Sequence, residues 1–202
     1  MISDTTAAAA DPKLFQSDNQ FDQLYPAFIR KLTARHWTPL HIARQSAAFL
    51  AVEDGARILD IGSGAGKFCL AAAHYQPAAS FYGVEQRSSL VSQAKQLKNL
   101  LSLRNAHFLQ GNFTQLDFRD FDHFYFYNSF YENLPGTEKI DEQVDYSEEL
   151  YHYYNRYLYR LLDQKPAGTR LVTFHSLEGE VPPGYHVVSS ENNELLKFWI
   201  KI

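Results

Sequence analysis

From residue 57 onwards, short apolar runs alternate with amphipathic stretches along the chain. The apolar runs are nearly continuous, as in parallel strands that are buried on both faces. The stretches between them carry apolar residues at helical spacing. This alternation predicts an α/β fold with a mostly parallel sheet. The predicted strands are 58–61, 80–84, 106–109, 121–127 and 170–174, and the predicted helices are 67–74, 87–101 and 144–162.

The last part of the chain has a different pattern. Residues 185–190 and 195–202 alternate apolar and polar side chains, and the polar stretch 191–194 joins them. A period of two is typical of strands with one buried face. The pattern predicts an antiparallel hairpin that closes the sheet.

The region before residue 57 is expected to be helical after a tail. Residues 1–20 are small and polar, which is typical of a disordered terminus. No repeat or linker interrupts the remainder. We therefore expect one domain over residues 21–202, with N-terminal helices within 21–54.

Two helices are predicted within that N-terminal part. Residues 21–34 have apolar side chains at helical spacing, and Pro26 is expected in the first turn. Thr38 followed by Pro39 is typical of a helix start, with Thr38 as the N-cap. The second helix is expected to end near Gly55.

Composition narrows the class of protein. Apolar residues make up 45% of the chain and charged residues 21%, as in an ordinary globular domain. The net charge of −4 gives no basic footprint for a nucleic acid. A single cysteine, Cys69, excludes an internal disulfide framework. Without a membrane-length apolar run, a signal peptide or a zinc-type ligand cluster, we expect a cytoplasmic protein with no bound metal.

The first predicted strand leads into a glycine-rich turn. Gly62, Gly64 and Gly66 occupy alternate positions, and a helical pattern begins at Lys67. Glycines let a backbone pass close to a ligand, and free N–H groups at a helix start face it. The spacing is not that of the dinucleotide motif, because Lys67 stands where that motif requires another glycine.

An acidic residue at the end of the second predicted strand indicates what the glycine-rich turn binds. Glu85 follows the second strand, about 20 residues beyond the glycines. A carboxylate at the tip of that strand lies beside the turn and can accept hydrogen bonds from both hydroxyls of a ribose. Turn and carboxylate together predict a nucleoside site.

The sequence from 58 to 66, Ile-Leu-Asp-Ile-Gly-Ser-Gly-Ala-Gly, and Tyr-Gly-Val-Glu at 82–85 resemble a motif pair of class I S-adenosylmethionine (SAM)-dependent methyltransferases. The resemblance runs from about residue 57 to the C-terminus. It implies a Rossmann-like, seven-stranded, mostly parallel sheet and SAM as cofactor. The cofactor-binding residues that it implies are Asp60, Gly62, Ser63, Gly64, Gly66, Glu85, Gln86, Asn112 and Phe113.

Asn112 departs from the usual family pattern. In the family, a polar residue at this position, more often Asp, meets the adenine amino group, and an apolar neighbour such as Phe113 covers the ring. Asn112 can still accept a hydrogen bond through its side-chain oxygen. The alternative is a turn residue that tolerates positive φ.

The end of the fourth predicted strand is the expected position of the methyl acceptor, because ligands of open α/β sheets bind beyond the carboxyl ends of the strands. Asn128-Ser129-Phe130-Tyr131 resembles the Asn-Pro-Pro-aromatic motif of amino-group methyltransferases, with Ser129 and Phe130 in place of the prolines. It is also similar in part to non-SET histone-lysine methyltransferases. The resemblance implies a nitrogen acceptor, with Asn128 and Tyr131 as catalytic residues and Phe130 in the substrate site. The alternative is that Asn128 caps a loop and the aromatic residues belong to the core.

Two further segments bear on the substrate. Residues 132–149 are strongly acidic, and such a rim repels polyanions and attracts cations. The alternative is a solvated helix face. His-Trp-Thr-Pro at 36–39 resembles the aromatic-Thr-Pro entry of some DNA adenine-amino methyltransferases, which implies that Trp37 contacts substrate.

We therefore predict a SAM-dependent methyltransferase that acts on nitrogen in a protein side chain or a small amine. Nucleic acid is the less favoured partner, no membrane partner is expected, and the oligomeric state is left open. The alternatives are a protein that binds SAM without turnover, a nucleic-acid adenine-amino methyltransferase, and an NAD-linked oxidoreductase, against which the glycine spacing argues.

Overall fold

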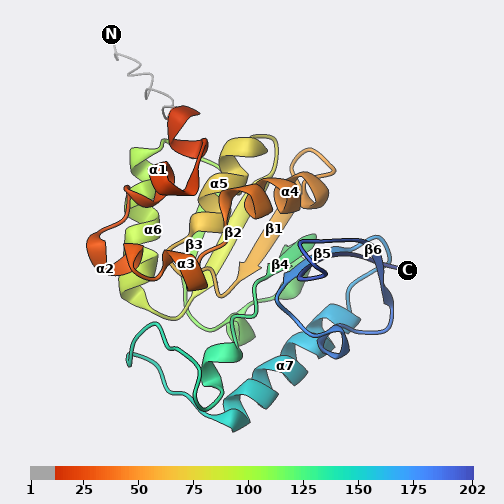
Figure 1. Cartoon of the computed structure of the whole chain (residues 1–202). Coiled ribbons are helices and arrows are strands. Elements are labelled where there is room, and N and C mark those ends of the chain that lie inside the picture. Colours follow the sequence, from red (N-terminus) through yellow and green to blue (C-terminus); the bar gives the residue numbers. More distant parts are fainter. Residues whose placement is uncertain (1–11) are drawn as a thin grey trace.

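Seven strands form one sheet in the part of the chain that the structure describes, residues 12–202 of a computed structural model (Figure 1). The strand order is β3-β2-β1-β4-β5-β7-β6. The first five strands are parallel, and β7 is antiparallel to β5 and β6. The expected α/β sheet with a terminal hairpin is confirmed. The strands are β1 (Arg57–Ile61), β2 (Ser80–Glu85), β3 (Ala106–Gln110), β4 (His123–Phe126), β5 (Arg170–Phe174), β6 (Tyr185–Glu191) and β7 (Leu196–Lys201).

Strand residues alternate between two apolar layers, as the pleat requires. Ile58 and Phe81 pack with the helices α4, α5 and α6, whereas Leu59 and Ile61 pack with α7. Figure 1 shows α4 and α5 on one side of the strands and α7 on the other. The helices are α4 (Leu40–Leu50), α5 (Lys67–Tyr75), α6 (Ser88–Leu100) and α7 (Glu148–Asp163).

The N-terminal segment is not the single helix predicted for residues 21–34. It is broken into α1 (Asp18–Asp22), α2 (Ala27–Arg30) and α3 (Thr33–His36). Pro26 is the N-cap of α2, because proline cannot donate the backbone hydrogen bond that a continuous helix would need. Buried Lys67 holds α1 in place through ion pairs with Asp18 (2.6 Å) and Asp22 (2.7 Å).

The boundary expected for the tail also differs. Residues 12–20 instead form η1 (Pro12–Phe15) and the start of α1. Phe15 is buried, and its carbonyl accepts a hydrogen bond of 2.9 Å from the Tyr75 hydroxyl. The first part of the predicted tail, residues 1–11, lies outside the described residues.

Thr38 is not an N-cap. Its hydroxyl lies 2.9 Å from that of Tyr125 on β4, and Pro39 occupies the cap position of α4 without a side-chain hydrogen bond. Tertiary contact with the sheet therefore replaces the local cap. The helix also ends at Leu50, before the predicted end near Gly55.

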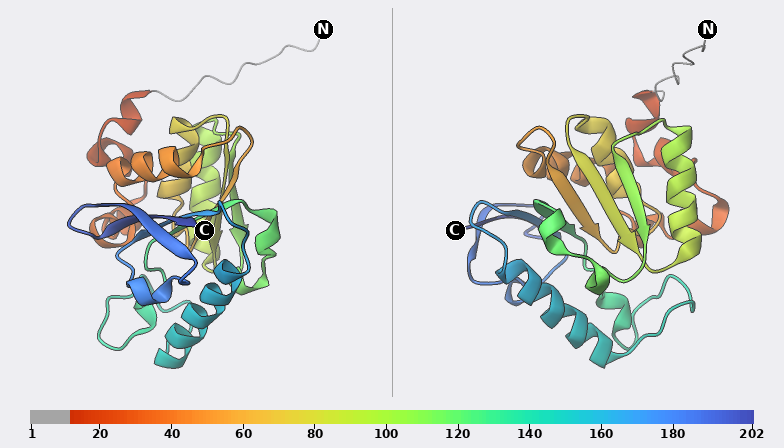
Figure 2. Two further views of the ribbon diagram at one scale, coloured as in Figure 1. Left: turned by 90° about the vertical axis from the view of Figure 1, so that its right-hand side faces the viewer. Right: turned by 180° about the vertical axis from the view of Figure 1, so that it is seen from behind.

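A long loop separates β4 from α7. The sequence predicts helix from residue 144, but α7 begins at Glu148, where the Ser147 hydroxyl accepts from the N–H of Leu150 at 3.1 Å. The loop contains the short turn η4 (Tyr131–Asn133). Figures 1 and 2 draw it in teal, beyond the carboxyl ends of the strands. The other short turns are η2 (Phe113–Gln115), η3 (Phe118–Asp120) and η5 (Glu178–Glu180).

Candidate active site

A cavity of about 760 Å³ opens at the carboxyl ends of the parallel strands. It lies where the chain crosses from one half of the sheet to the other, as expected for an open α/β fold. Gly66 and Asn112 do not line it. The predicted site residues that line it are Trp37, Asp60, Gly62, Ser63, Gly64, Glu85, Gln86, Phe113, Asn128, Phe130 and Tyr131.

The glycine turn forms the floor of this cavity. Gly62 and Gly64 have φ angles of 77° and 53°, which favour glycine. A Cβ atom on Gly62 would overlap the side chain of Ser129, and one on Gly64 would overlap the ring of Trp37. Gly66 has a different role, because its backbone is the N-cap of α5 and packs tightly against Phe108.

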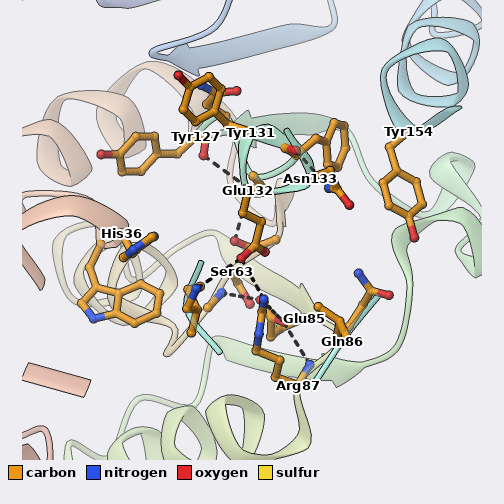
Figure 3. Close-up of a pocket in the computed structure, with 18 of the residues that line it drawn as sticks. His36, Ser63, Glu85, Gln86, Arg87, Tyr127, Tyr131, Glu132, Asn133 and Tyr154 are labelled. Carbon is orange, nitrogen blue, oxygen red and sulfur yellow. Dashed lines mark hydrogen bonds and ion pairs between the residues drawn. The ribbon is translucent and has the colours of Figure 1, made fainter. Parts of the chain in front are cut away.

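Glu85 stands beside the turn, as the sequence predicts. Its carboxylate is 5% exposed and accepts from the N–H of Gly64 at 3.1 Å through Oε2. Oε1 accepts from the N–H of Arg87 at 2.9 Å and from its guanidinium at 3.2 Å. Figure 3 shows Glu85 between Ser63 and Arg87. Oε2 holds one donor, so it retains a lone pair that can accept from a ribose hydroxyl.

Asp60 lies deeper in the same site. Its carboxyl group is buried, and the Cys69 thiol lies 3.6 Å from Oδ2. The pKa of Asp60 is raised to about 8, mainly by burial; the hydrogen bond from Cys69 opposes this rise, and the nearby charge of Glu85 adds to it. Burial also raises the pKa of the Cys69 thiol, which makes it a poor nucleophile at neutral pH.

Phe113 supplies an aromatic wall where an adenine ring is expected. Its ring stacks on Phe130 with centroids 5.1 Å apart and an interplanar angle of 24°. Asn112 supports this wall from behind. Its side-chain oxygen accepts from the N–H of Thr114 at 3.1 Å, and its amide donates to the Tyr154 hydroxyl at 2.8 Å. The structure therefore brings Phe113, rather than Asn112, to the cavity surface.

The four residues 128–131, which follow β4, lie in different environments. Asn128 lines the cavity with φ of 37°, and its side-chain amide makes no hydrogen bond within residues 12–202. The Ser129 hydroxyl donates to the carbonyl of Ile61 at 2.6 Å. Phe130 is buried with Phe126 in the apolar layer that packs against α7, whereas Tyr131 is 52% exposed at the rim.

Two histidines on the wall were not among the sequence candidates. His175 follows β5 with φ of 58°, and its ring lies 5.6 Å from that of Tyr127. His36 precedes Trp37. Burial lowers the pKa of both imidazoles, and for His36 the charges of Arg87 and Arg35 lower it further. Positive φ in residues other than glycine at the ends of adjacent strands, at Asn128 and His175, could not be read from the sequence.

The acidic segment does rim the cavity, through Glu132, Glu138 and Asp145. Much of its charge is neutralised, however. Arg87 pairs with Glu132 at 2.8 Å and with Asp141 at 3.0 Å, and exposed Arg35 pairs with Glu138. The expected acidic surface is therefore weaker than the sequence alone suggests.

A family model described as a methyltransferase domain matches residues 52–156, which include the glycine turn, Glu85 and Asn128. The chain belongs to this methyltransferase family. Its relatives include the tRNA (guanine-N(7)-)-methyltransferases of Synechococcus sp. (strain JA-3-3Ab), 50% identical, and of Nostoc sp. (strain PCC 7120 / SAG 25.82 / UTEX 2576), 44% identical. Each match covers 54 residues, 27% of this chain and 23% or 25% of the relative.

Two solved structures share the fold of this chain. TrmN from Thermus thermophilus has a TM-score of 0.58 at 20% identity, over 87% of this chain and 52% of that chain. An RNA methyltransferase from Salinibacter ruber, in complex with S-adenosyl-L-homocysteine, has a TM-score of 0.54 at 17% identity, over 80% of this chain and 88% of that chain. Membership of the methyltransferase family supports SAM as the cofactor.

The residues present fit SAM. The backbone at Gly62 and Gly64 lines the cavity, Glu85 offers a carboxylate oxygen, and Phe113 offers a flat apolar wall. SAM supplies an activated methyl group on a sulfonium. None of the described helices combines the length and apolar character that crossing a membrane requires.

Proposed function

We propose that this methyltransferase transfers a methyl group from SAM to a nitrogen atom of a protein side chain or small amine. The observation that carries the proposal is the free amide of Asn128 on the cavity wall, beside the glycine turn. Its side-chain oxygen can accept a hydrogen bond from an N–H of the methyl acceptor. This bond holds the nitrogen lone pair in line with the methyl carbon for displacement. Tyr131, Trp37 and Phe130 line the same cavity.

An ammonium acceptor must lose a proton before it can attack. The imidazole of His175 stands just beyond β5, next to β4, which leads into Asn128. The His175 imidazole lines the same cavity, and its neutral form can accept that proton. Asn128, which holds the methyl acceptor, and His175, which accepts its proton, thus follow adjacent strands.

The charges at the rim favour a basic or neutral acceptor. Arg35 and Arg87 are paired with acids, and Asp145 is exposed at the rim without an ion pair among the described residues. A polyanion would therefore meet no unpaired basic cluster there. The net charge of −4 acts in the same direction.

An RNA base is the second candidate acceptor. The tRNA (guanine-N(7)-)-methyltransferases that match locally, and the RNA methyltransferase that shares the fold, favour it. The local match covers 27% of this chain and 23% of that relative. The aromatic side chains of Trp37 and Tyr131 line this cavity, and a flat base can stack on such surfaces.

Transfer of label from methyl-labelled SAM tests the proposal. The full chain is incubated with lysate that has been separated into protein, RNA and small-molecule fractions. Label in protein or amines, lost in Asn128→Ala, supports the first proposal. Label in RNA replaces it with the second, and SAM binding without transfer to any fraction would show a binding protein instead.

A further inference from the structure

The guanidinium of Arg87 is the centre of a buried charge network. Arg87 lies between β2 and α6 as the N-cap residue of that helix, and it is 3% exposed. Its nitrogen atoms donate to carboxylates of Glu85 (3.2 Å), Glu132 (2.8 Å) and Asp141 (3.0 Å). A further bond of 2.7 Å goes to the Tyr146 hydroxyl. Burial lowers the pKa of Arg87, but the charges of Glu132 and Glu85 outweigh this effect and hold the pKa above its usual value.

These partners belong to two parts of the site. Glu85 ends β2 and is the expected acceptor for the ribose. The other three, Glu132, Asp141 and Tyr146, come from the loop between β4 and α7. In Figure 3, Glu132 extends across the cavity toward Arg87, which lies next to Glu85. One side chain thus connects the cofactor side of the cavity to the acidic loop.

Apart from the bonds to Arg87, the loop has few polar attachments to the body of the protein. Residues 134–147 contain no helix or strand. The ion pair from Glu138 to Arg35 is exposed on both sides, and such pairs contribute little to stability. The Lys139 ammonium donates to the carbonyl of Glu132, which is within the same loop. The buried bonds to Arg87 are therefore the main polar attachment among the described residues.

We propose that Arg87 is a positioning residue that holds residues 131–146 as a lid over the cofactor cavity and couples closure of this lid to binding at Glu85. A guanidinium serves this role because its planar fork binds several carboxylates at once in fixed directions. When the lid opens, Glu132 and Asp141 move away from Arg87, and Arg87 retains only its ion pair with Glu85. The inference rests on the proposed SAM site but not on the identity of the methyl acceptor.

Hydrogen exchange of the full chain, with and without S-adenosylhomocysteine, tests the lid. The first variant is Glu132→Gln/Asp141→Asn, which keeps Arg87 paired with Glu85 and avoids leaving buried carboxylates without a cation. Amide exchange in residues 131–146 should rise by about tenfold or more, while exchange in β1 and β2 stays unchanged. Asp117→Asn is the matched control, because Asp117 pairs with Arg119 on the surface away from the cavity.

S-adenosylhomocysteine should slow exchange of residues 131–146 in the wild type and the control, but much less in the double variant. Arg87→Lys should restore part of the protection that Arg87→Gln loses, because it keeps the charge but not the fork. Equal exchange of this loop in wild type and the double variant would overturn the lid. If the wild type does not bind the product at all, the SAM site fails, and exchange in the unliganded proteins still decides the lid.

Discussion

The hydroxyl of Ser129 donates a hydrogen bond of 2.6 Å to the main-chain carbonyl of Ile61. This bond fastens the loop after β4 to the end of β1, where the glycine turn begins. Ser129 stands at a position where amino-group methyltransferases have proline. Here a side-chain hydrogen bond, rather than a rigid ring, fixes the loop that carries Asn128.

Replacing Ser129 with alanine should loosen this loop. The free energy of unfolding should fall by about 0.5–1.5 kcal/mol, the usual net value of one hydrogen bond. Turnover should fall as well, because Asn128 loses its fixed position. Urea titration and steady-state kinetics measure the two effects, with exposed Ser190→Ala as the control. Full turnover in Ser129→Ala would show that the hydroxyl does not position the loop.

Substitution of Gly64 should displace Trp37. The sequence alone suggests that a side chain here would project into the nucleoside site, but the structure directs it at the Trp37 ring. Gly64→Ala should destabilise the protein by about 1–3 kcal/mol, because φ of 53° is also strained for alanine. Tryptophan fluorescence should shift to longer wavelength as Trp37 moves. An unchanged spectrum and unfolding midpoint would contradict the contact.

Asp60 should make stability depend on pH. The native carboxyl keeps its proton up to about pH 8, whereas an unfolded Asp releases it near pH ~4. Relative to Asp60→Asn, the wild-type free energy of unfolding should therefore fall as pH rises through this window, by at most about 1.4 kcal/mol per pH unit. Urea titrations of both proteins from about pH 5 to 8 measure the difference. A constant difference would mean that Asp60 is already ionised in the native state.

Asn128→Ala separates cofactor binding from turnover. Affinity for SAM should be nearly unchanged, and turnover should fall by up to ~10²-fold, the scale of one well-placed polar contact. Asn128→Asp keeps an acceptor oxygen and should be milder. Calorimetry and single-turnover kinetics give the two quantities. Loss of SAM affinity in Asn128→Ala would assign this residue to the cofactor site instead.

The sequence predicts the sheet and the glycine turn because both depend on local patterns. The positions of Gly64 and Glu85 could be predicted from their spacing in the sequence, and both residues lie on the cavity wall as expected. The contacts of Arg87 with Glu132 and Asp141 join residues far apart in the chain. The pattern of apolar and polar residues does not predict such contacts. The helix predicted for residues 21–34 is wrong because Pro26, which is expected in its first turn, instead separates α1 from α2.

Calorimetric titration with S-adenosylhomocysteine tests the central assignment, a SAM site between the glycine turn and Glu85. Wild type and the exposed control Glu53→Gln should bind with the same affinity. Glu85→Gln should bind about 10–100-fold more weakly, since a hydrogen bond to a charged group contributes about 1.5–3 kcal/mol. Equal affinity in a folded Glu85→Gln protein would contradict the assignment.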